Sequence, residues 1–328
     1  MRRRVLGRAL VAIPLLLCVA ALTFALVESA PGNPADMLLG DRPVPPEVRE
    51  RLERAYGLDR PPAERFVRWL VALSRGELGW SWSRSMPVSR ALASALPATL
   101  LLAGAALAVH VLAGIAIGVT AAARRGRLLD RILTHSSLAL WAMPTFWVGL
   151  MAILALAYGL PVFPPSSMRS VGAGDLPPVA RALDLLWHLC LPACVLGLSS
   201  AAATARFVRA GLLQTLDEEF VRAARARGLG GGRVLLAHAL RNAMLPVINV
   251  LGLSMPVLVS GSLVIEVVFA WPGMGRLTYD AILAQDVPVV LATTLLASAM
   301  VIAGSLAADL AMAAVDPRTR GALTGAKS

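Results

Sequence analysis

Residues 218–246 read EEFVRAARARGLGGGRVLLAHALRNAMLP, and this basic, glycine-rich stretch lies between two long apolar stretches of the chain. Its first part favours a short helix in which the alanines Ala223 and Ala224 leave room for close contact with another surface. Gly228 and the glycines after it favour a turn that other residues resist. A second helix is expected at 233–240, so the stretch predicts an exposed helical hairpin.

The stretches around this hairpin have the composition of a membrane protein. Hydrophobic residues make up 57% of the 328 residues, charged residues only 16%, and the mean hydropathy is +0.69. A helix needs roughly 20 apolar residues to cross a bilayer, and an alternating β-barrel pattern is absent. The sequence therefore predicts an all-α membrane protein with six transmembrane helices. Uncharged runs occur at 9–27, 91–123, 132–158, 185–205, 243–265 and 287–308.

The distribution of basic residues predicts the orientation of these helices. Four Arg lie in residues 1–8, four in 124–131, seven in 206–241, and two Arg with one Lys in 318–327. Because Lys and Arg collect in short cytoplasmic loops, both termini are expected in the cytoplasm. The first loop is long and almost balanced in charge, so it lies outside this rule. The net charge of +11 thus reflects topology, and no nucleic-acid partner is expected.

Four segments are expected along the chain. They are an N-terminal stub with the first helix (1–27), an extracytoplasmic loop (28–94), a membrane domain (95–314) with a cytoplasmic loop at about 212–242, and a cytoplasmic tail (315–328). The extracytoplasmic loop contains two helix-like pieces, at 47–56 and 63–75.

Prolines predict where the spans begin or bend. Pro97 is expected in the first turn of the second span, whereas Pro144, Pro192 and Pro256 lie inside spans and should kink or break them.

Two features have simpler interpretations than they first suggest. Arg2 to Arg4 before an apolar run also fit a secretory leader, but the run is long and residues 28–31 form a poor cleavage site. Cys18, Cys190 and Cys194 lie in apolar spans and are expected to be small buried hydrophobic residues, with no metal site.

The hairpin resembles the coupling loop of binding-protein-dependent ABC importer permeases. That loop has Glu-Ala-Ala, three residues, Gly, nine residues, an aliphatic residue, one residue and Leu-Pro. Alignment on the turn glycine matches the two alanines and the leucine, while Arg222, His238 and Arg241 depart from the pattern. Without the resemblance, a hairpin held by anionic lipid is equally reasonable. The resemblance implies ATPase-coupling roles for Glu219, Ala223, Ala224, Arg225, Gly228 and Leu240.

The resemblance covers nearly the whole chain and is similar in detail to the oligopeptide, dipeptide and nickel permease branch. Several separate blocks carry it in the same order: APGNP at 30–34, YGLDRP at 56–61, LPATL at 96–100, WPGMG at 271–275 and DPR at 316–318.

This resemblance implies a type I ABC importer permease fold and half of a translocation pathway for peptides, with nickel or another small solute as the alternative. It implies four kinds of partner: a second related permease, two ATP-binding subunits, an extracytoplasmic solute-binding protein and membrane lipid. ATP and Mg would be bound by the ATPase partners, with no catalytic, cofactor or metal site on this chain. In agreement, the chain lacks a G-x-x-x-x-G-K-[ST] phosphate loop.

Two further sets of residues are candidates for specific roles. Asp309 lies inside the final apolar run, where a carboxylate needs a partner or water. A structural ion pair with Arg206 is expected for this carboxylate, with a proton relay as the alternative. A second set is Glu266, Trp271, Pro272 and Gly273. These residues are expected to form a rigid turn, a re-entrant loop or an outer contact for the solute-binding protein.

Two other functional classes fit less well. Gly197-Leu198-Ser199-Ser200 resembles the serine site of an intramembrane protease, but all four histidines precede the last two spans, where that family's base is expected. An ion-coupled secondary transporter would need mid-membrane carboxylates and an inverted repeat, and neither is apparent.

Overall fold

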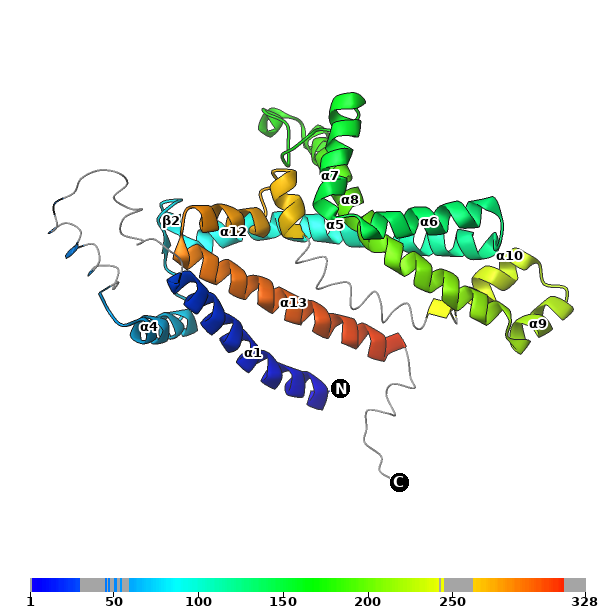
Figure 1. The fold of residues 1–328 in the computed structure, drawn as a ribbon, viewed down its shortest axis with the longest axis horizontal. Coiled ribbons are helices and arrows are strands. Elements are labelled where there is room, and N and C mark those ends of the chain that lie inside the picture. Colours follow the sequence, from blue (N-terminus) through cyan, green and yellow to red (C-terminus); the bar gives the residue numbers. More distant parts are fainter. Residues whose placement is uncertain are drawn as a thin grey trace, which may run out of the picture. The chain divides into compact units, whose positions relative to one another are not determined.

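The computed structural model describes residues 2–29, 59–241, 243–244 and 262–315, together with positions 45, 47, 50, 51 and 54. The described chain is mainly helical, as expected (Figure 1). Its α-helices are α1 (Arg2–Glu28), α4 (Pro62–Ser74), α5 (Val88–Ala123), α6 (Leu128–Ala142), α7 (Thr145–Ile153), α8 (Pro178–Leu216), α9 (Glu219–Ala226), α10 (Gly231–Arg233), α12 (Met274–Leu283) and α13 (Val287–Val315). Other helical turns are η1 (Leu154–Gly159), η2 (Ala173–Asp175) and η3 (Val234–Ala239), and β1 (Trp80–Ser81) pairs antiparallel with β2 (Met86–Pro87).

Within these described residues, four helices are long and apolar enough to cross a membrane. They are Val11–Glu28 of α1, all of α5, all of α8 and Val287–Ala307 of α13. The bent pair α6 and α7–η1 adds a fifth if it counts as one span. The sixth expected span, 243–265, lies mostly outside the described residues, so the total of six stays a prediction.

The expected third span is broken in the middle. α6 ends at Ala142, and the chain turns by 106° before α7 continues from Thr145 (Figure 1). Pro144 caps α7, and the residue before it, Met143, has an extended ψ of 138°. A proline forces its predecessor out of helical conformation, so the break expected at Pro144 is confirmed.

The expectation for Pro97 is wrong. This proline lies well inside α5 instead of in a first helical turn, because α5 begins at Val88. The helix starts early because the short β1–β2 ribbon ends there, with the Val88 N–H donating to the Gly79 carbonyl at 3.1 Å. Pro192 also lies inside its helix, α8, and Pro256 falls outside the described residues.

The chain divides into two compact units, each with its own packing. Unit 1 comprises Met1–Thr99 and Pro272–Met300, and unit 2 comprises Leu100–Trp271 and Val301–Ser328. The core of unit 1 consists of aliphatic side chains from the start of α5, α12 and α13. Its buried members are Val88, Ala91, Leu92, Ala95, Met274, Leu277, Ala281, Val289, Val290 and Ala292.

Two polar contacts organise unit 1 around this core. The buried carboxylate of Asp286, between α12 and α13, accepts hydrogen bonds from the Ser81 hydroxyl at 2.6 Å and the Ser83 hydroxyl at 2.7 Å. α4 packs beside α1, where Arg65 pairs with Glu28 at 2.7 Å. α4 confirms the helix expected at 63–75, while the one expected at 47–56 lies largely outside the described residues.

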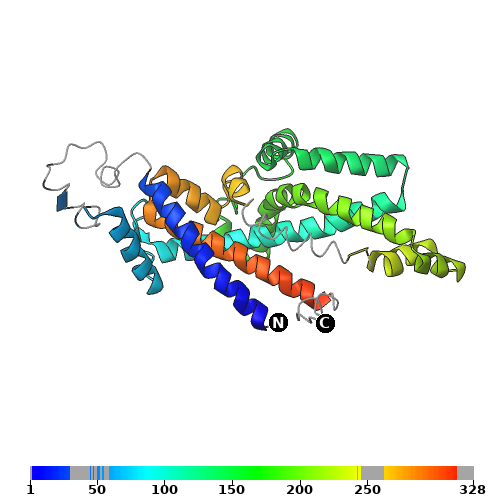
Figure 2. The same ribbon diagram turned by 60° about the horizontal axis from the view of Figure 1, so that its bottom comes forward.

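Unit 2 is built on a close approach of α5 and α8 (Figure 2). A Cβ added at Gly118 of α5 would lie 2.6 Å from the Ala205 carbonyl oxygen and 2.6 Å from Val208 Cβ. A Cβ at Gly197 of α8 would meet the Ala106 carbonyl oxygen at the same distance. Small residues allow helix backbones to pack this closely in membranes, so glycine at these two positions is what permits the contact between α5 and α8.

Candidate functional site: the hairpin after α8

The hairpin, defined here as residues 218–241, follows directly on α8 (Figures 1 and 2). Glu218 has an extended conformation and occupies the cap position of α9. Glu219 lies in the first turn of α9 and Arg225 in the last, where each charge interacts favourably with the helix dipole. These features separate α9 from α8 as a helix of its own.

A glycine turn joins α9 to the second half of the hairpin. Gly228 has a φ of +78°, its N–H donates to the Arg225 carbonyl at 2.9 Å, and the Leu229 N–H donates to the Ala224 carbonyl at 3.4 Å. These are the two hydrogen bonds of the Schellman motif, which favours glycine. An added Cβ would meet nothing within 4 Å, so glycine is needed for its backbone conformation and not for space.

The two halves of the hairpin share a small core. Val221 and Ala224 of α9 are fully buried against Val234, at the start of η3. Leu216 and Leu229 pack around these three side chains. Because Val221 and Ala224 are three residues apart, both face the same side of the helix. The hairpin is therefore a folded body with its own interior.

A second apolar cluster fastens this body to the rest of unit 2. Ala239 of η3 is buried with Val208 and Leu212 of α8 and with Ala122 at the end of α5. Leu240 packs against the same cluster and is partly buried. The hairpin is thus seated on the last turns of α8 and α5.

The opposite face of α9 is open to another molecule. Phe220 is 42% exposed, and Ala223 and Arg227 are also exposed. These three side chains follow a spacing of three and four residues and form one stripe. Exposed arginines flank it and Glu219 is exposed beside it, so this face combines an aromatic, a small and several charged side chains. The flanking arginines are Arg222 and Arg225.

The structure divides the six expected coupling residues into three groups. Glu219, Ala223 and Arg225 are exposed on α9, Ala224 and Leu240 pack inward, and Gly228 forms the turn. The two neighbouring alanines therefore have different environments.

Of the expected Arg206–Asp309 pair, the structure describes the side chain of Arg206 only. The Arg206 guanidinium carbon lies 4.6 Å from the centroid of the Trp141 ring, a cation–π distance. The side chain of Asp309 lies outside the described residues, so the pair stays a prediction.

An ion pair that the sequence reasoning missed lies close to the hairpin. The carboxylate of Asp130, in the first turn of α6, accepts from Arg209 Nε at 2.7 Å and from Arg209 Nη2 at 2.9 Å. Asp130 is 3% exposed. A usable signal was present, because Asp130 is the only acidic residue between Glu77 and Asp175 and has four arginines around it.

The expected outer contact is mostly buried. Glu266 and Trp271 are fully buried and Gly273 is buried, whereas Pro272 is exposed. The burial corrects the expectation that all four could meet a binding protein directly. A contact role narrows to Pro272 and stays a prediction.

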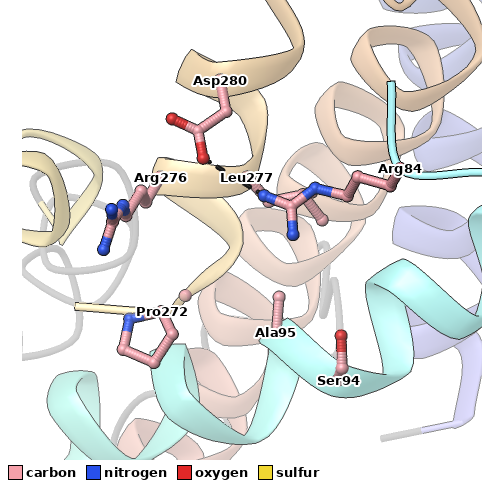
Figure 3. A pocket seen from close by; sticks show the side chains of 8 residues that line it. Arg84, Ser94, Ala95, Pro272, Arg276, Leu277 and Asp280 are labelled. Atoms are coloured by element: carbon pink, nitrogen blue, oxygen red, sulfur yellow. Dashed lines mark hydrogen bonds and ion pairs between the residues drawn. The ribbon is translucent and has the colours of Figure 1, made fainter. Parts of the chain in front are cut away.

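Unit 1 has a cavity of about 320 Å³ between the start of α5 and α12 (Figure 3). Arg84 and Asp280 point toward each other across its rim, with a nitrogen-to-oxygen distance of 3.1 Å. Both side chains are more than 40% exposed. The cavity is therefore an open polar depression whose charges are partly compensated.

The serine and histidine side chains that the alternative protease interpretation would need make other contacts. The Ser199 hydroxyl donates to the Val195 carbonyl of its own helix at 2.8 Å. Buried His110 lies 2.8 Å from the Thr204 hydroxyl, with the direction of that bond set by the tautomer. A serine and histidine in catalytic contact are not found among these described residues.

The expectation that the three cysteines are buried is wrong for two of them. Cys18 and Cys190 are exposed and Cys194 is half-buried, and all three are free thiols. Apolar helix faces that would be covered by lipid remain exposed in a single chain, which explains the difference.

The long apolar helices are those of a membrane protein, and comparison with known families identifies the family to which it belongs. The family described as binding-protein-dependent transport system inner membrane component matches residues 114–321, and a second family, described as the N-terminal part of that membrane component, matches residues 1–103. The chain belongs to this family.

Individual relatives agree with this assignment over nearly the full length. The chain is 36% identical to the oligopeptide transport system permease protein AppB of Bacillus subtilis, over 96% of this chain and 98% of that protein. It is 35% identical to the dipeptide transport system permease protein DppB of Escherichia coli K12, with the same coverage. A chain of the inward-facing MetNI methionine ABC transporter shares the fold, with a TM-score of 0.55 at 17% identity over 69% of this chain and 96% of that one.

Proposed function

We propose that this chain is a permease subunit of an ATP-driven importer and forms half of the pathway for di- and oligopeptides across the cytoplasmic membrane. The observation that carries the proposal is the near full-length similarity to permeases named for oligopeptide and dipeptide transport. The exposed face of the hairpin after α8 would provide the surface for contact with an ATP-binding subunit.

The proposed topology has six transmembrane helices and cytoplasmic termini. The four or five span-length helices of the described residues support it, as does the concentration of arginines in 124–131 and 206–241. In this topology the hairpin lies in the cytoplasm.

The proposed assembly contains a second related permease, two ATP-binding subunits and an extracytoplasmic solute-binding protein. ATP and Mg would bind to the ATP-binding subunits, because this chain carries no phosphate-binding loop sequence. The exposed stripe of Phe220, Ala223 and Arg227 would meet an ATP-binding subunit. Closure of the two ATP-binding subunits would displace α9, and the hairpin core would carry the displacement into α8.

Reconstitution tests the functional class. The complete assembly in proteoliposomes should take up a labelled dipeptide only when ATP and the binding protein are present, whereas this chain alone should take up none. Uptake by the chain alone would contradict the proposal.

Site-specific crosslinking tests the role of α9. In a background without native cysteines, Ala223→Cys should crosslink to an ATP-binding subunit in the active assembly. Val179→Cys is a matched control, because Val179 is also exposed but lies at the opposite end of α8. A crosslink from position 179 and none from position 223 would show that α9 is not the motor contact.

A further inference from the structure

Two arginines on one face of α8 hold α6. The Arg209 guanidinium contacts both carboxylate oxygens of Asp130 in a bidentate arrangement, at 2.7 and 2.9 Å. The same carboxylate accepts from the Gly126 N–H at 2.9 Å and from the Thr134 hydroxyl at 3.3 Å. Bidentate charged hydrogen bonds fix orientation as well as distance, so the first turn of α6 is locked to α8.

The second arginine acts further along α6. Arg206, three residues before Arg209 and therefore on the same face of α8, places its guanidinium over the Trp141 ring. Asp130 lies in the first turn of α6 and Trp141 in the last. α6 is therefore held near both ends by side chains of α8.

The Asp130–Arg209 pair lies between the apolar cluster that contacts the hairpin and the helix that leads into the break at Pro144. On one side, Val208 and Leu212, which flank Arg209 on α8, belong to the apolar cluster on which the hairpin is seated. On the other side, α6 leads directly into the 106° break before α7. A displacement of the hairpin that moves α8 would reach the break if α6 followed α8.

We propose that the Asp130–Arg209 ion pair is a positioning contact that makes α6 follow α8, so that movement of the hairpin reaches the break at Pro144. The inference rests on the proposed transport function. Apolar contacts have little directional preference, whereas a bidentate pair holds its two groups in one relative orientation. The ion pair thus resists the relative motion that would dissipate the displacement.

The test measures peptide uptake per ATP hydrolysed in the reconstituted assembly. Asp130→Asn and Arg209→Gln should lower this ratio about tenfold while binding-protein-stimulated ATP hydrolysis stays within about twofold. Arg209→Lys, which keeps the charge without the bidentate geometry, should give an intermediate ratio. Asp286→Asn is the control, because it makes the same chemical change at a buried carboxylate in unit 1 and should leave the ratio unchanged.

A second measurement separates this inference from the proposed function. Spin labels at Leu128 of α6 and Gln214 of α8, both exposed, report the distance between the two helices in the purified chain without any need for transport. The distance distribution between the two labels should be narrow in the chain with the ion pair intact and broader in the Asp130→Asn variant. If the reconstituted assembly took up no peptide, the proposed function would fail, and the label distances would still decide the ion-pair contact.

Two results would overturn the inference. One is an unchanged ratio of uptake to hydrolysis in both Asp130→Asn and Arg209→Gln. The other is an equally narrow distance distribution with and without the ion pair, which would show that α6 and α8 are held together by other contacts.

Discussion

Units 1 and 2 each bury a carboxylate, but different groups hold the two carboxylates. In unit 2, Asp130 is paired with the arginine of a neighbouring long helix. In unit 1, the groups of the described chain that donate to Asp286 are uncharged, two serine hydroxyls and one backbone N–H, and its Oδ1 has no hydrogen bond there. A hydroxyl can rotate to follow a small movement, whereas a bidentate ion pair has one geometry. The difference agrees with the proposal that the ion pair of unit 2 transmits movement between helices, whereas the Asp286 contacts of unit 1 hold the β1–β2 ribbon in place.

Removal of the carboxylate charge should have its largest effect in unit 2. Asp130→Asn leaves Arg209 partly buried without its counter-ion, and we expect a loss of about 3 kcal/mol in unfolding free energy, the low end for a broken buried pair because Arg209 is 29% exposed. Thermal unfolding of the detergent-purified chain measures it. The double variant Asp130→Leu with Arg209→Met should recover most of the loss, and a double variant as unstable as the single one would contradict this explanation.

The close approach of α5 and α8 should be the next most sensitive feature. Gly118→Ala places a methyl group 2.6 Å from two atoms of α8, so we expect about 2 kcal/mol of destabilisation from overpacking. Gly104→Ala is the matched control on the same helix, because an added Cβ there meets nothing within 4 Å. Thermal unfolding of both variants should separate them, and equal midpoints would show that α5 and α8 can move apart without cost.

The sequence alone predicts features formed by residues close together in the chain better than contacts between residues far apart in it. The hairpin, the turn at Gly228 and the break at Pro144 follow from residues next to one another in the chain, and the sequence was sufficient for them. Asp130 and Arg209 are 79 residues apart, and their contact depends on how α6 packs against α8, which no local pattern specifies. The same limit explains Glu266 and Trp271. A tryptophan beside proline and glycine fits an exposed turn, and only the tertiary structure shows that it is buried.

The glycine turn of the hairpin offers a smaller and more specific effect. Gly228→Ala should cost about 1 kcal/mol, because a non-glycine residue must adopt a φ of +78°, and it should also lower uptake per ATP by distorting the hairpin. Gly76 of unit 1 has a φ of +81° and equally open surroundings, so Gly76→Ala should cost the same stability and leave uptake per ATP unchanged. If uptake per ATP fell in both variants, this ratio would depend on the stability of the chain and not on the conformation of the hairpin.

In unit 1, Asp286→Asn should cost about 1 kcal/mol, clearly less than Asp130→Asn. Asparagine keeps an oxygen that can accept from Ser81 and Ser83, and no described cation loses its partner. Thermal unfolding under the conditions used for Asp130→Asn makes the comparison direct. Equal losses at the two positions would remove the distinction between the charged contact of unit 2 and the neutral contact of unit 1.

The smallest effect should come from the ion pair at the rim of the unit 1 cavity. Arg84 and Asp280 are 41% and 44% exposed, and exposed pairs contribute only about 0.5 kcal/mol because water and salt screen them. Arg84→Gln should therefore change the unfolding midpoint by about 1 °C or less, and raising the salt concentration should not alter the difference measurably. If Arg84→Gln lowered the unfolding free energy as much as Asp130→Asn, unit 1 would also depend on a specific ion pair. The greater exposure of the Arg84–Asp280 pair would then not explain a difference between the two units.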